Sequence, residues 1–190
     1  MTAPQASDCY VPLRQSAQAL LDHCQQRVTS DEVLWLPHFG FLATPLSCNW
    51  IASEPALQAV QQICPIAQLG ILKMPDHWVY HWHRDQNRQA CINLLISSDH
   101  HSHTLFGRSV SETSMHCLEL RYQPGRFYLF NNQVPHTVIN LDVSRYLLSL
   151  EFAEPVPYAE LKQRFADSGL LDLEGEEPGL SISTEDNQVN

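Results

Sequence analysis

The sequence predicts a mainly β protein with flanking helices, in which many short strands form an antiparallel sandwich or barrel. From residue 68 onward, runs of apolar, β-branched and aromatic residues alternate with turn-like stretches. Amphipathic segments with helical spacing precede this region, and one such segment follows it. Because strands and helices are segregated along the chain, we expect the helices to buttress the sheets from outside.

The N-terminal part is predicted to be mostly helical. Residues 1–10 are polar without periodicity and are expected to be loose, whereas residues 12–28 place apolar side chains at helical spacing. Those side chains are Leu13, Ala17, Leu20, Leu21 and Cys24. Residues 33–36 and 39–42 are expected to form short strands interrupted by Pro37 and His38. A second amphipathic helix is expected over 54–63, with Pro55 near its start, where a helix tolerates proline.

The central region predicts a jelly roll. Strands are expected over residues 69–74, 78–83, 90–97, 116–122, 127–130, 137–141 and 146–152, with turns between them, including residues 97–103. A last helix is expected over residues 158–167, followed from Asp172 by an acidic tail that packs weakly or irregularly. This order predicts a double-stranded β-helix, that is, a jelly-roll or cupin-like barrel supported by helices.

Length and composition fit one domain. Its 190 residues are divided here into a helical N-terminal support (1–67), a β-barrel core (68–152) and a C-terminal helix with an acidic tail (153–190). The formal net charge of −10 argues against nucleic acid or an anionic membrane as a partner. No apolar run is long enough to span a bilayer.

The cysteines and the N-terminus lead us to expect a cytoplasmic protein. The first residues lack the charged and then apolar pattern of a signal peptide. The six cysteines form no Cys-x-x-Cys pair and no regular framework, so reduced and mostly buried thiols are expected.

A candidate metal site is formed by two histidines and one carboxylate, His83, Asp85 and His136. On a strand, residues two apart point to the same face, so His83 and Asp85 are expected to aim together. A set of two histidines and one carboxylate leaves coordination positions open, as in non-heme Fe(II) oxygenases. Arg145 then supplies a planar guanidinium that can bind a carboxylate.

The order of these residues resembles the Fe(II)/2-oxoglutarate-dependent oxygenase superfamily over roughly residues 68–152. The segments that carry the resemblance are His83-Arg84-Asp85, residues 92–96, residues 124–132 beginning Pro-Gly, His136 and Arg145. Within the superfamily the chain is most similar to the prolyl and aspartyl/asparaginyl hydroxylase-like branches.

The resemblance implies a reaction and a set of roles. His83, Asp85 and His136 would bind Fe(II), and Arg145 would bind the distal carboxylate of the cosubstrate 2-oxoglutarate. With O2, and ascorbate as a reductant, 2-oxoglutarate would yield succinate and CO2 while a C–H bond of a peptide, amino acid or small metabolite is hydroxylated. The oligomeric state is not implied.

One part of the family pattern is missing. Leu147 stands where some branches carry a hydroxyl residue two positions after the arginine. The candidates for this second partner of 2-oxoglutarate are Tyr80, Asn93 and Ser149. Arg88 is a further candidate for a carboxylate of cosubstrate or substrate.

Several positions also have ordinary structural interpretations. His136 can be a rim histidine, Asp85 a turn residue and Arg145 a strand-edge residue. His81 has the parity of His83 and can face the site or simply pack. The side chains Trp78, Tyr80 and Trp82 form the opposite stripe and are expected to pack in the core, and residues 100–103, His-His-Ser-His, are expected to form a solvated loop.

Two alternative functions stay open. A cupin-type metal enzyme that does not use 2-oxoglutarate would explain His81 and His83, but the glutamate or glutamine expected soon after them is absent, since Asn87 and Arg88 occupy that stretch. A jelly-roll module that binds a ligand without catalysis is the other alternative. A structural metal is normally held by four protein ligands, whereas this set offers three.

Overall fold

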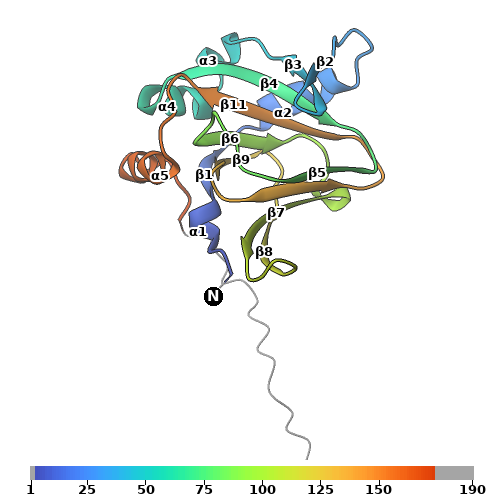
Figure 1. The fold of residues 1–190 in the computed structure, drawn as a ribbon. Helices are drawn as coiled ribbons and strands as arrows, with labels where there is room; N and C mark the ends of the chain where they lie inside the picture. The colour runs from blue at the N-terminus through green and yellow to red at the C-terminus, as the bar shows by residue number, and fades with distance from the viewer. Residues whose placement is uncertain (1–2, 174–190) are drawn as a thin grey trace, which may run out of the picture.

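Two antiparallel sheets face each other in the computed structural model, which describes residues 3–173 (Figure 1). The larger sheet has the strand order β1-β9-β6-β11-β4-β3-β2, and the smaller has the order β5-β10-β7-β8. The strands are β1 (Tyr10–Ser16), β2 (Leu36–His38), β3 (Phe41–Pro45), β4 (Ile66–Met74), β5 (Trp78–His83), β6 (Ala90–Leu95), β7 (Ser102–Ser109), β8 (Met115–Leu120), β9 (Arg126–Asn131), β10 (His136–Asn140) and β11 (Arg145–Phe152). The predicted mainly β jelly-roll architecture is therefore confirmed.

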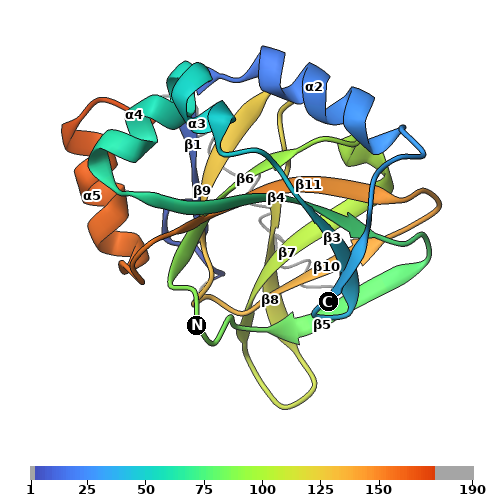
Figure 2. The same cartoon turned by 90° about the horizontal axis from the view of Figure 1, so that it is seen from above.

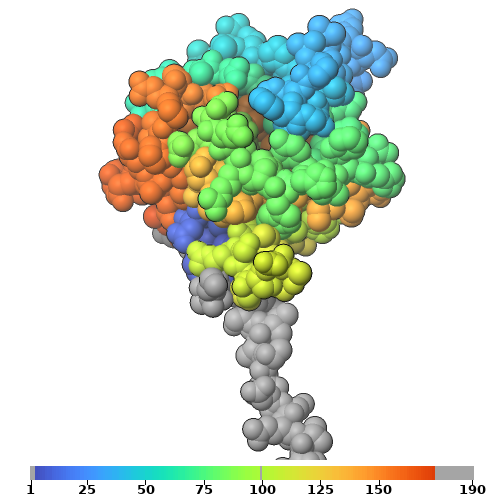
Figure 3. All heavy atoms as spheres, in the orientation of Figure 1, coloured from blue at the N-terminus to red at the C-terminus, as the bar shows by residue number. Residues whose placement is uncertain are grey.

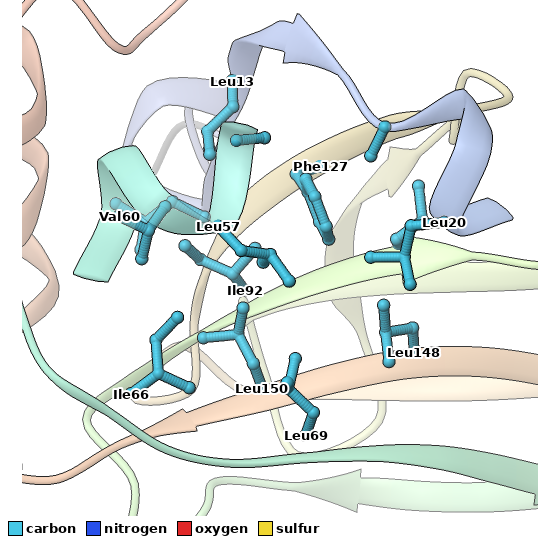
Figure 4. Close-up of a cluster of buried hydrophobic side chains, with 14 of the residues drawn as sticks. Leu13, Leu20, Leu57, Val60, Ile66, Leu69, Ile92, Phe127, Leu148 and Leu150 are labelled. Carbon is cyan, nitrogen blue, oxygen red and sulfur yellow. The ribbon is translucent and has the colours of Figure 1, made fainter. Parts of the chain in front are cut away.

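The helices cover the outer face of the larger sheet, as Figure 2 shows for α2, α4 and α5. The helices are α1 (Ala6–Cys9), α2 (Gln18–Val28), α3 (Asn49–Ser53), α4 (Pro55–Ile63) and α5 (Tyr158–Asp167). The apolar faces of α2, α4 and α5 meet the sheet in one buried cluster. Helix α2 contributes Leu20 and α4 contributes Leu57 (Figure 4), and α5 contributes Phe165. None of the helices in the part of the chain that the structure describes is both long and apolar enough to cross a membrane.

Strand β11 shows how the core is divided between two layers. Leu148 and Leu150 point outward into the cluster beneath the helices, whereas Leu147 belongs to a second cluster, with Phe106 and Phe130, between the sheets. This two-residue alternation is that of a strand buried on both faces. The polar members of the inner stripe of β11 therefore face the space between the sheets, where the candidate site lies.

We expect the substitution Phe127→Ala to destabilise the fold strongly. The side chain of Phe127 is fully buried between the larger sheet and the helices, as Figure 4 shows. Truncating a buried phenylalanine costs about 3–5 kcal/mol, so the free energy of unfolding in urea should fall by this amount. Leu34→Ala is the control, since Leu34 is 70% exposed, and a similar loss in both variants would contradict the assignment of this core.

Several sequence predictions are confirmed. The helix over 54–63 is α4, and the helix over 158–167 is α5. The strands predicted from residue 69 to residue 152 all exist, with boundaries shifted by a few residues at most. All six cysteines are free, and four of them are buried: Cys9, Cys24, Cys64 and Cys91.

The prediction of a helix from residue 12 is wrong, because residues 12–16 belong to strand β1 and the helix begins at Gln18. Val11 and Leu13 are buried while their neighbours are more exposed, which is the period of a strand, and β1 pairs with β9. The expectation of loose structure before residue 10 is also wrong for the described residues, since Cys9 is fully buried at the end of α1.

Strands β2 and β7 differ from the sequence prediction. Strand β2 contains Pro37 and His38, which were expected to separate strands; β2 is an edge strand, where a missing N–H is tolerated. Strand β7 (Ser102–Ser109) was not predicted at all, and the loop expected over 100–103 is wrong from Ser102 onward, where β7 begins. Helix α3 was not predicted.

The C-terminal segment is described as far as residue 173. Leu171 forms a bridge with Leu13, and Asp172 forms an ion pair with Arg126, so the first residues of the predicted tail pack against β1 and β9. The remainder of the predicted acidic tail lies outside the described residues.

Candidate metal centre

The structure brings His83, Asp85 and His136 together at one end of the space between the sheets. One ligand atom from each residue lies within 4.8 Å of the others. Asp85 Oδ1 is 3.5 Å from His83 Nε2 and 3.9 Å from His136 Nε2. Two imidazole nitrogens and one carboxylate oxygen thus converge on one point from segments about 50 residues apart in the sequence.

Strand pairing explains this convergence only for the two histidines. His83 is the last residue of β5, His136 is the first residue of β10, and the two are directly paired. Asp85 lies in the loop after β5, so the expectation that it shares a strand face with His83 is wrong. Its carboxylate nevertheless reaches the histidines, because other contacts hold this loop.

Backbone carbonyls fix both imidazole rings. His83 Nδ1 lies 2.7 Å from the carbonyl oxygen of His81, and His136 Nδ1 lies 2.9 Å from that of Val134. A carbonyl only accepts, so each Nδ1 carries a proton, and each Nε2 is directed toward Asp85. This arrangement orients an imidazole for a metal.

The protonation states also suit metal binding. Burial lowers the pKa of His136 to about 4, and the rings of Phe106 and Phe130 pack near it. Burial pushes the pKa of Asp85 upward, but the hydrogen bond with His83 and the charge of Arg88 outweigh burial, and the pKa is lowered. At neutral pH His136 is therefore neutral and Asp85 is ionised, the forms that bind a metal.

A cavity of about 460 Å³ extends from these three residues between the two sheets. Both sheets line it: the larger sheet contributes Asn93, Phe130 and Leu147, and the smaller contributes Thr104 and Val138. His83, Asp85, His136 and the buried Arg145 all line this cavity. Its size is that of a site for small molecules.

Arg145 lies on the inner stripe of β11 and is only 6% exposed. Its Nε donates to Ser102 Oγ at 3.1 Å, and its Nη2 donates to Thr104 Oγ1 at 3.2 Å. The ring of Tyr122 lies 5.8 Å from the guanidinium carbon. Arg145 is thus held by hydroxyl groups of β7, and the surface-residue interpretation of Arg145 is wrong.

The sequence prediction missed the hydroxyl residues beside Arg145. Ser102, Thr104 and Phe106 alternate on the buried face of β7. The sequence does contain a pattern that fits a strand, because these two hydroxyl residues and the phenylalanine occupy every second position and so share one face. His100, His101 and His103, which precede or interrupt this pattern, made the segment resemble a loop.

The predicted candidates for the second cosubstrate contact lie in different parts of the cavity. Asn93 lines it from strand β6 and is 5% exposed. Tyr80 lies beside His83, with ring centroids 4.3 Å apart. Ser149 also lines the cavity, but its Oγ accepts a hydrogen bond from Arg88. Arg88 binds a carboxylate, namely that of Asp85, at 2.8 Å.

The predicted packing of the tryptophan and tyrosine stripe in the core is wrong. Trp78 and Trp82 are 43% and 40% exposed, and Tyr80 faces the cavity. The register of β5 shifts against β10 between Tyr80 and His83. Tyr80 pairs with Val138 and His83 pairs with His136, so β5 contains one more residue than β10 between these two pairs. This bulge places Tyr80 and His83 on the same face, which strict alternation forbids, and leaves His81 exposed.

The hairpin of β2 and β3 forms one side of the cavity mouth. Figure 3 shows this hairpin, in blue, against the green segment that contains β5. Phe41 of β3 packs edge-on against Tyr80, with ring centroids 5.3 Å apart. Phe39 at the turn is 74% exposed, has a φ of 45° and lines the mouth. Positive φ is unfavourable for a bulky residue, so the turn holds an aromatic ring in solvent at a conformational cost.

Comparison with known proteins gives matches among solved structures only. No protein-family model and no curated protein sequence matches this chain. A prolyl-4-hydroxylase from Pseudomonas putida matches with a TM-score of 0.52 and 17% identity, over 76% of this chain and 91% of that protein. HygX from Streptomyces hygroscopicus, solved with nickel, 2-oxoglutarate and hygromycin B bound, matches with a TM-score of 0.53 and 9% identity, over 74% of this chain and 81% of HygX.

A third match is SnoN, a non-heme α-ketoglutarate-dependent epimerase from nogalamycin biosynthesis. It aligns with a TM-score of 0.51 and 10% identity, over 74% of this chain and 76% of SnoN. At these identities the likeness shows a common fold. The chain therefore has the jelly-roll fold found in 2-oxoglutarate- and metal-dependent oxygenases, with a His-Asp-His group and a buried arginine in its cavity.

Proposed function

We propose that this protein is an Fe(II)- and 2-oxoglutarate-dependent oxygenase that hydroxylates a C–H bond. The observation that carries the proposal is the presence of His83, Asp85, His136 and Arg145 in one cavity of a jelly roll. The shared fold with oxygenases of this kind supports it. Fold alone does not imply function, so the proposal rests on the chemistry of the site.

The donor set fits Fe(II). Two imidazoles and one carboxylate can hold one side of the ion, so positions stay open for other ligands. When bound, the ion would supply the activation of O2 that couples oxidative decarboxylation of 2-oxoglutarate to oxidation of a C–H bond.

Arg145 would bind the distal carboxylate of 2-oxoglutarate. A guanidinium can bind a carboxylate through two parallel hydrogen bonds, which fix orientation as well as position. Ser102 and Thr104 hold the guanidinium in place, and Asn93 and Tyr122 line the cavity nearby. Apolar neighbours such as Leu147 would exclude water from this end and strengthen the charge pairing.

The mouth of the cavity suggests how a substrate would enter. The residues that line the cavity include the aromatic residues Phe39, Phe41 and Tyr80, together with Gln86 and Asn87 of the loop after β5. This pairing of aromatic rings with amide groups suits a peptide, an amino acid or a small metabolite. We propose a hydroxylase of the prolyl or aspartyl/asparaginyl type, and the likeness to a prolyl-4-hydroxylase supports this branch.

Succinate formation from 2-oxoglutarate tests the proposal. The purified protein would be incubated with Fe(II), ascorbate and 2-oxoglutarate in air, with a protein-free blank and an assay without Fe(II). Succinate that requires both protein and Fe(II) is the expected result. If no succinate forms, direct binding of Co(II) and 2-oxoglutarate would be measured by calorimetry, and absence of both would overturn the proposal.

The substitution Thr104→Val should raise the KM for 2-oxoglutarate with little change in kcat. Valine keeps the shape of threonine but removes the hydroxyl that accepts from Arg145. Loss of one hydrogen bond to a charged group corresponds to roughly 1.5–3 kcal/mol, so a rise of about tenfold or more is expected. Thr113→Val, at an exposed turn, is the control, and equal KM values in both variants would contradict the role of Thr104.

A further inference from the structure

The carboxylate of Asp85 is held by two hydrogen bonds and an ion-pair contact that all end on one of its oxygens. Asp85 Oδ2 accepts hydrogen bonds from Arg88 Nε at 2.9 Å and from Asn132 Nδ2 at 2.8 Å, and Arg88 Nη2 lies 2.8 Å from it as an ion pair. The other oxygen, Oδ1, faces His83 and His136. The two oxygens of Asp85 therefore have different surroundings: Oδ2 is engaged by protein donors and Oδ1 is directed at the site.

We propose that Arg88 and Asn132 are positioning residues that fix Asp85 for metal binding through Oδ1 alone. The inference rests on the proposed function in that it assumes a metal at His83, Asp85 and His136. Because Asp85 is in a loop and not on a strand, the strand pairing that aligns the two histidines cannot align it. Side chains must do so instead.

The guanidinium of Arg88 is itself fixed. Its third nitrogen, Nη1, donates to Ser149 Oγ at 3.4 Å, on the inner stripe of β11. These contacts hold the Arg88 side chain, which is 29% exposed. All three nitrogens are thus engaged, two by Asp85 and one by the larger sheet, which assigns Arg88 to Asp85 and not to 2-oxoglutarate.

Asn132 and Gln133 connect this loop to the segment that leads into His136. The backbone N–H of Asp85 donates to the carbonyl of Asn132 at 3.1 Å, and that of Asn132 donates to the carbonyl of Gln89 at 3.2 Å. Gln133 Nε2 donates to the carbonyls of Asp85 at 2.9 Å and Arg88 at 2.8 Å. Asn132 is 2% exposed, so its amide is held firmly against Asp85. This network fixes the Asp85 loop relative to His136.

Two consequences follow for a metal. With Oδ2 engaged by Arg88 and Asn132, Asp85 offers one oxygen, which leaves more positions open for other ligands. The Arg88 fork also keeps the carboxylate from rotating when the site is empty, so less ordering is required on binding. Partners of this kind typically change metal affinity or activity by about 10–100-fold when they are removed.

Titration of the metal-free protein with Co(II), followed by calorimetry and by the visible absorption of the bound ion, tests the inference without an activity assay. Arg88→Ala and Asn132→Ala should each weaken Co(II) binding by about tenfold or more. They should also change the Co(II) spectrum, because Asp85 is no longer held to one oxygen. Arg88→Lys, which keeps the charge but loses the fork, should lie between Arg88→Ala and the wild type.

Arg121→Ala is the matched control. Arg121 also pairs with a carboxylate, that of Glu119, at 2.8 Å, but neither residue lines the cavity. Co(II) affinity in this variant should equal that of the wild type. Thermal unfolding without metal would be measured for every variant, and Arg88→Gln, which keeps one amide donor and most of the volume, replaces Arg88→Ala if the latter fails to fold.

A double variant separates action through Asp85 from any other role. In the Asp85→Ala background, adding Arg88→Ala should weaken Co(II) binding no further, since the carboxylate that Arg88 positions is gone. A wild-type protein that binds Co(II) no more tightly than its Arg88→Ala or Arg88→Gln variant would overturn the role of Arg88 and leave the proposed function intact. A wild-type protein that binds no Co(II) at all would overturn both.

Discussion

Asp85→Ala is expected to reduce Fe(II)-dependent succinate formation to the level of the protein-free blank. Asp85 is the one carboxylate of the His83, Asp85 and His136 group in the described residues, so its removal leaves only two imidazoles. Two imidazoles alone bind Fe(II) weakly, because the charge attraction and the chelate between His83 and Asp85 are both lost. The measurement is succinate formed per mole of protein over a range of Fe(II) concentrations.

The fold should survive this substitution. Asp85 lies in a loop at the cavity mouth, and the Arg88 guanidinium that loses its partner is partly exposed and can be hydrated. Thermal unfolding should therefore differ little from that of Asp22→Ala, a control at an exposed position of α2. Wild-type turnover in folded Asp85→Ala would show that the metal ligands have been assigned wrongly.

Arg145→Ala is expected to raise the KM for 2-oxoglutarate by roughly 100-fold or more. The guanidinium lies in a buried, partly apolar cavity, where a carboxylate that loses its charged partner also lacks water. Breaking a buried charge pair from one side costs about 3–5 kcal/mol, which corresponds to at least that change in affinity. The initial rate of succinate formation as a function of 2-oxoglutarate concentration measures the effect.

Two comparisons make the Arg145 result specific. Arg145→Lys keeps a charge without the planar fork, so its KM should lie between those of the alanine variant and the wild type. Co(II) affinity without 2-oxoglutarate should stay unchanged, because Arg145 is not in the metal group. An unchanged KM in folded Arg145→Ala would mean that the distal carboxylate binds elsewhere in the cavity.

Local patterns predicted most of the fold because two periodicities were clear. Strands β4, β5 and β8–β11 alternate in side-chain character or are bounded by proline, glycine and asparagine, and α5 follows two prolines. The predictions that failed concern short segments whose apolar residues fit both the period of a helix and the period of a strand. Leu13 and Ala17 suit a helix face, but pairing with β9 placed residues 10–16 in a strand. Strand β7 is recognisable mainly through its partners β8 and β10, which long-range hydrogen bonds select.

For the candidate site too, the sequence predicted some of the residues and missed others. The residue types and their spacing singled out His83, Asp85, His136 and Arg145, and the structure places them in one cavity. The hydroxyl partners of Arg145 were missed because they come from the opposite sheet, about 40 residues away along the chain. Tyr80 and His83 share one face of β5 only because a bulge interrupts the strand between them. Strict two-residue alternation does not predict that bulge.

The sequence by itself determined the fold class and the chemical character of the site, because side-chain type and short-range periodicity are properties of neighbouring residues. Only the tertiary structure decided which groups hold the functional side chains in place: Ser102 and Thr104 for Arg145, and Arg88 and Asn132 for Asp85. These contacts join residues from different strands and loops. They depend on sheet register, on one bulge and on the closure of the two sheets, each of which is fixed by the packing of the whole chain.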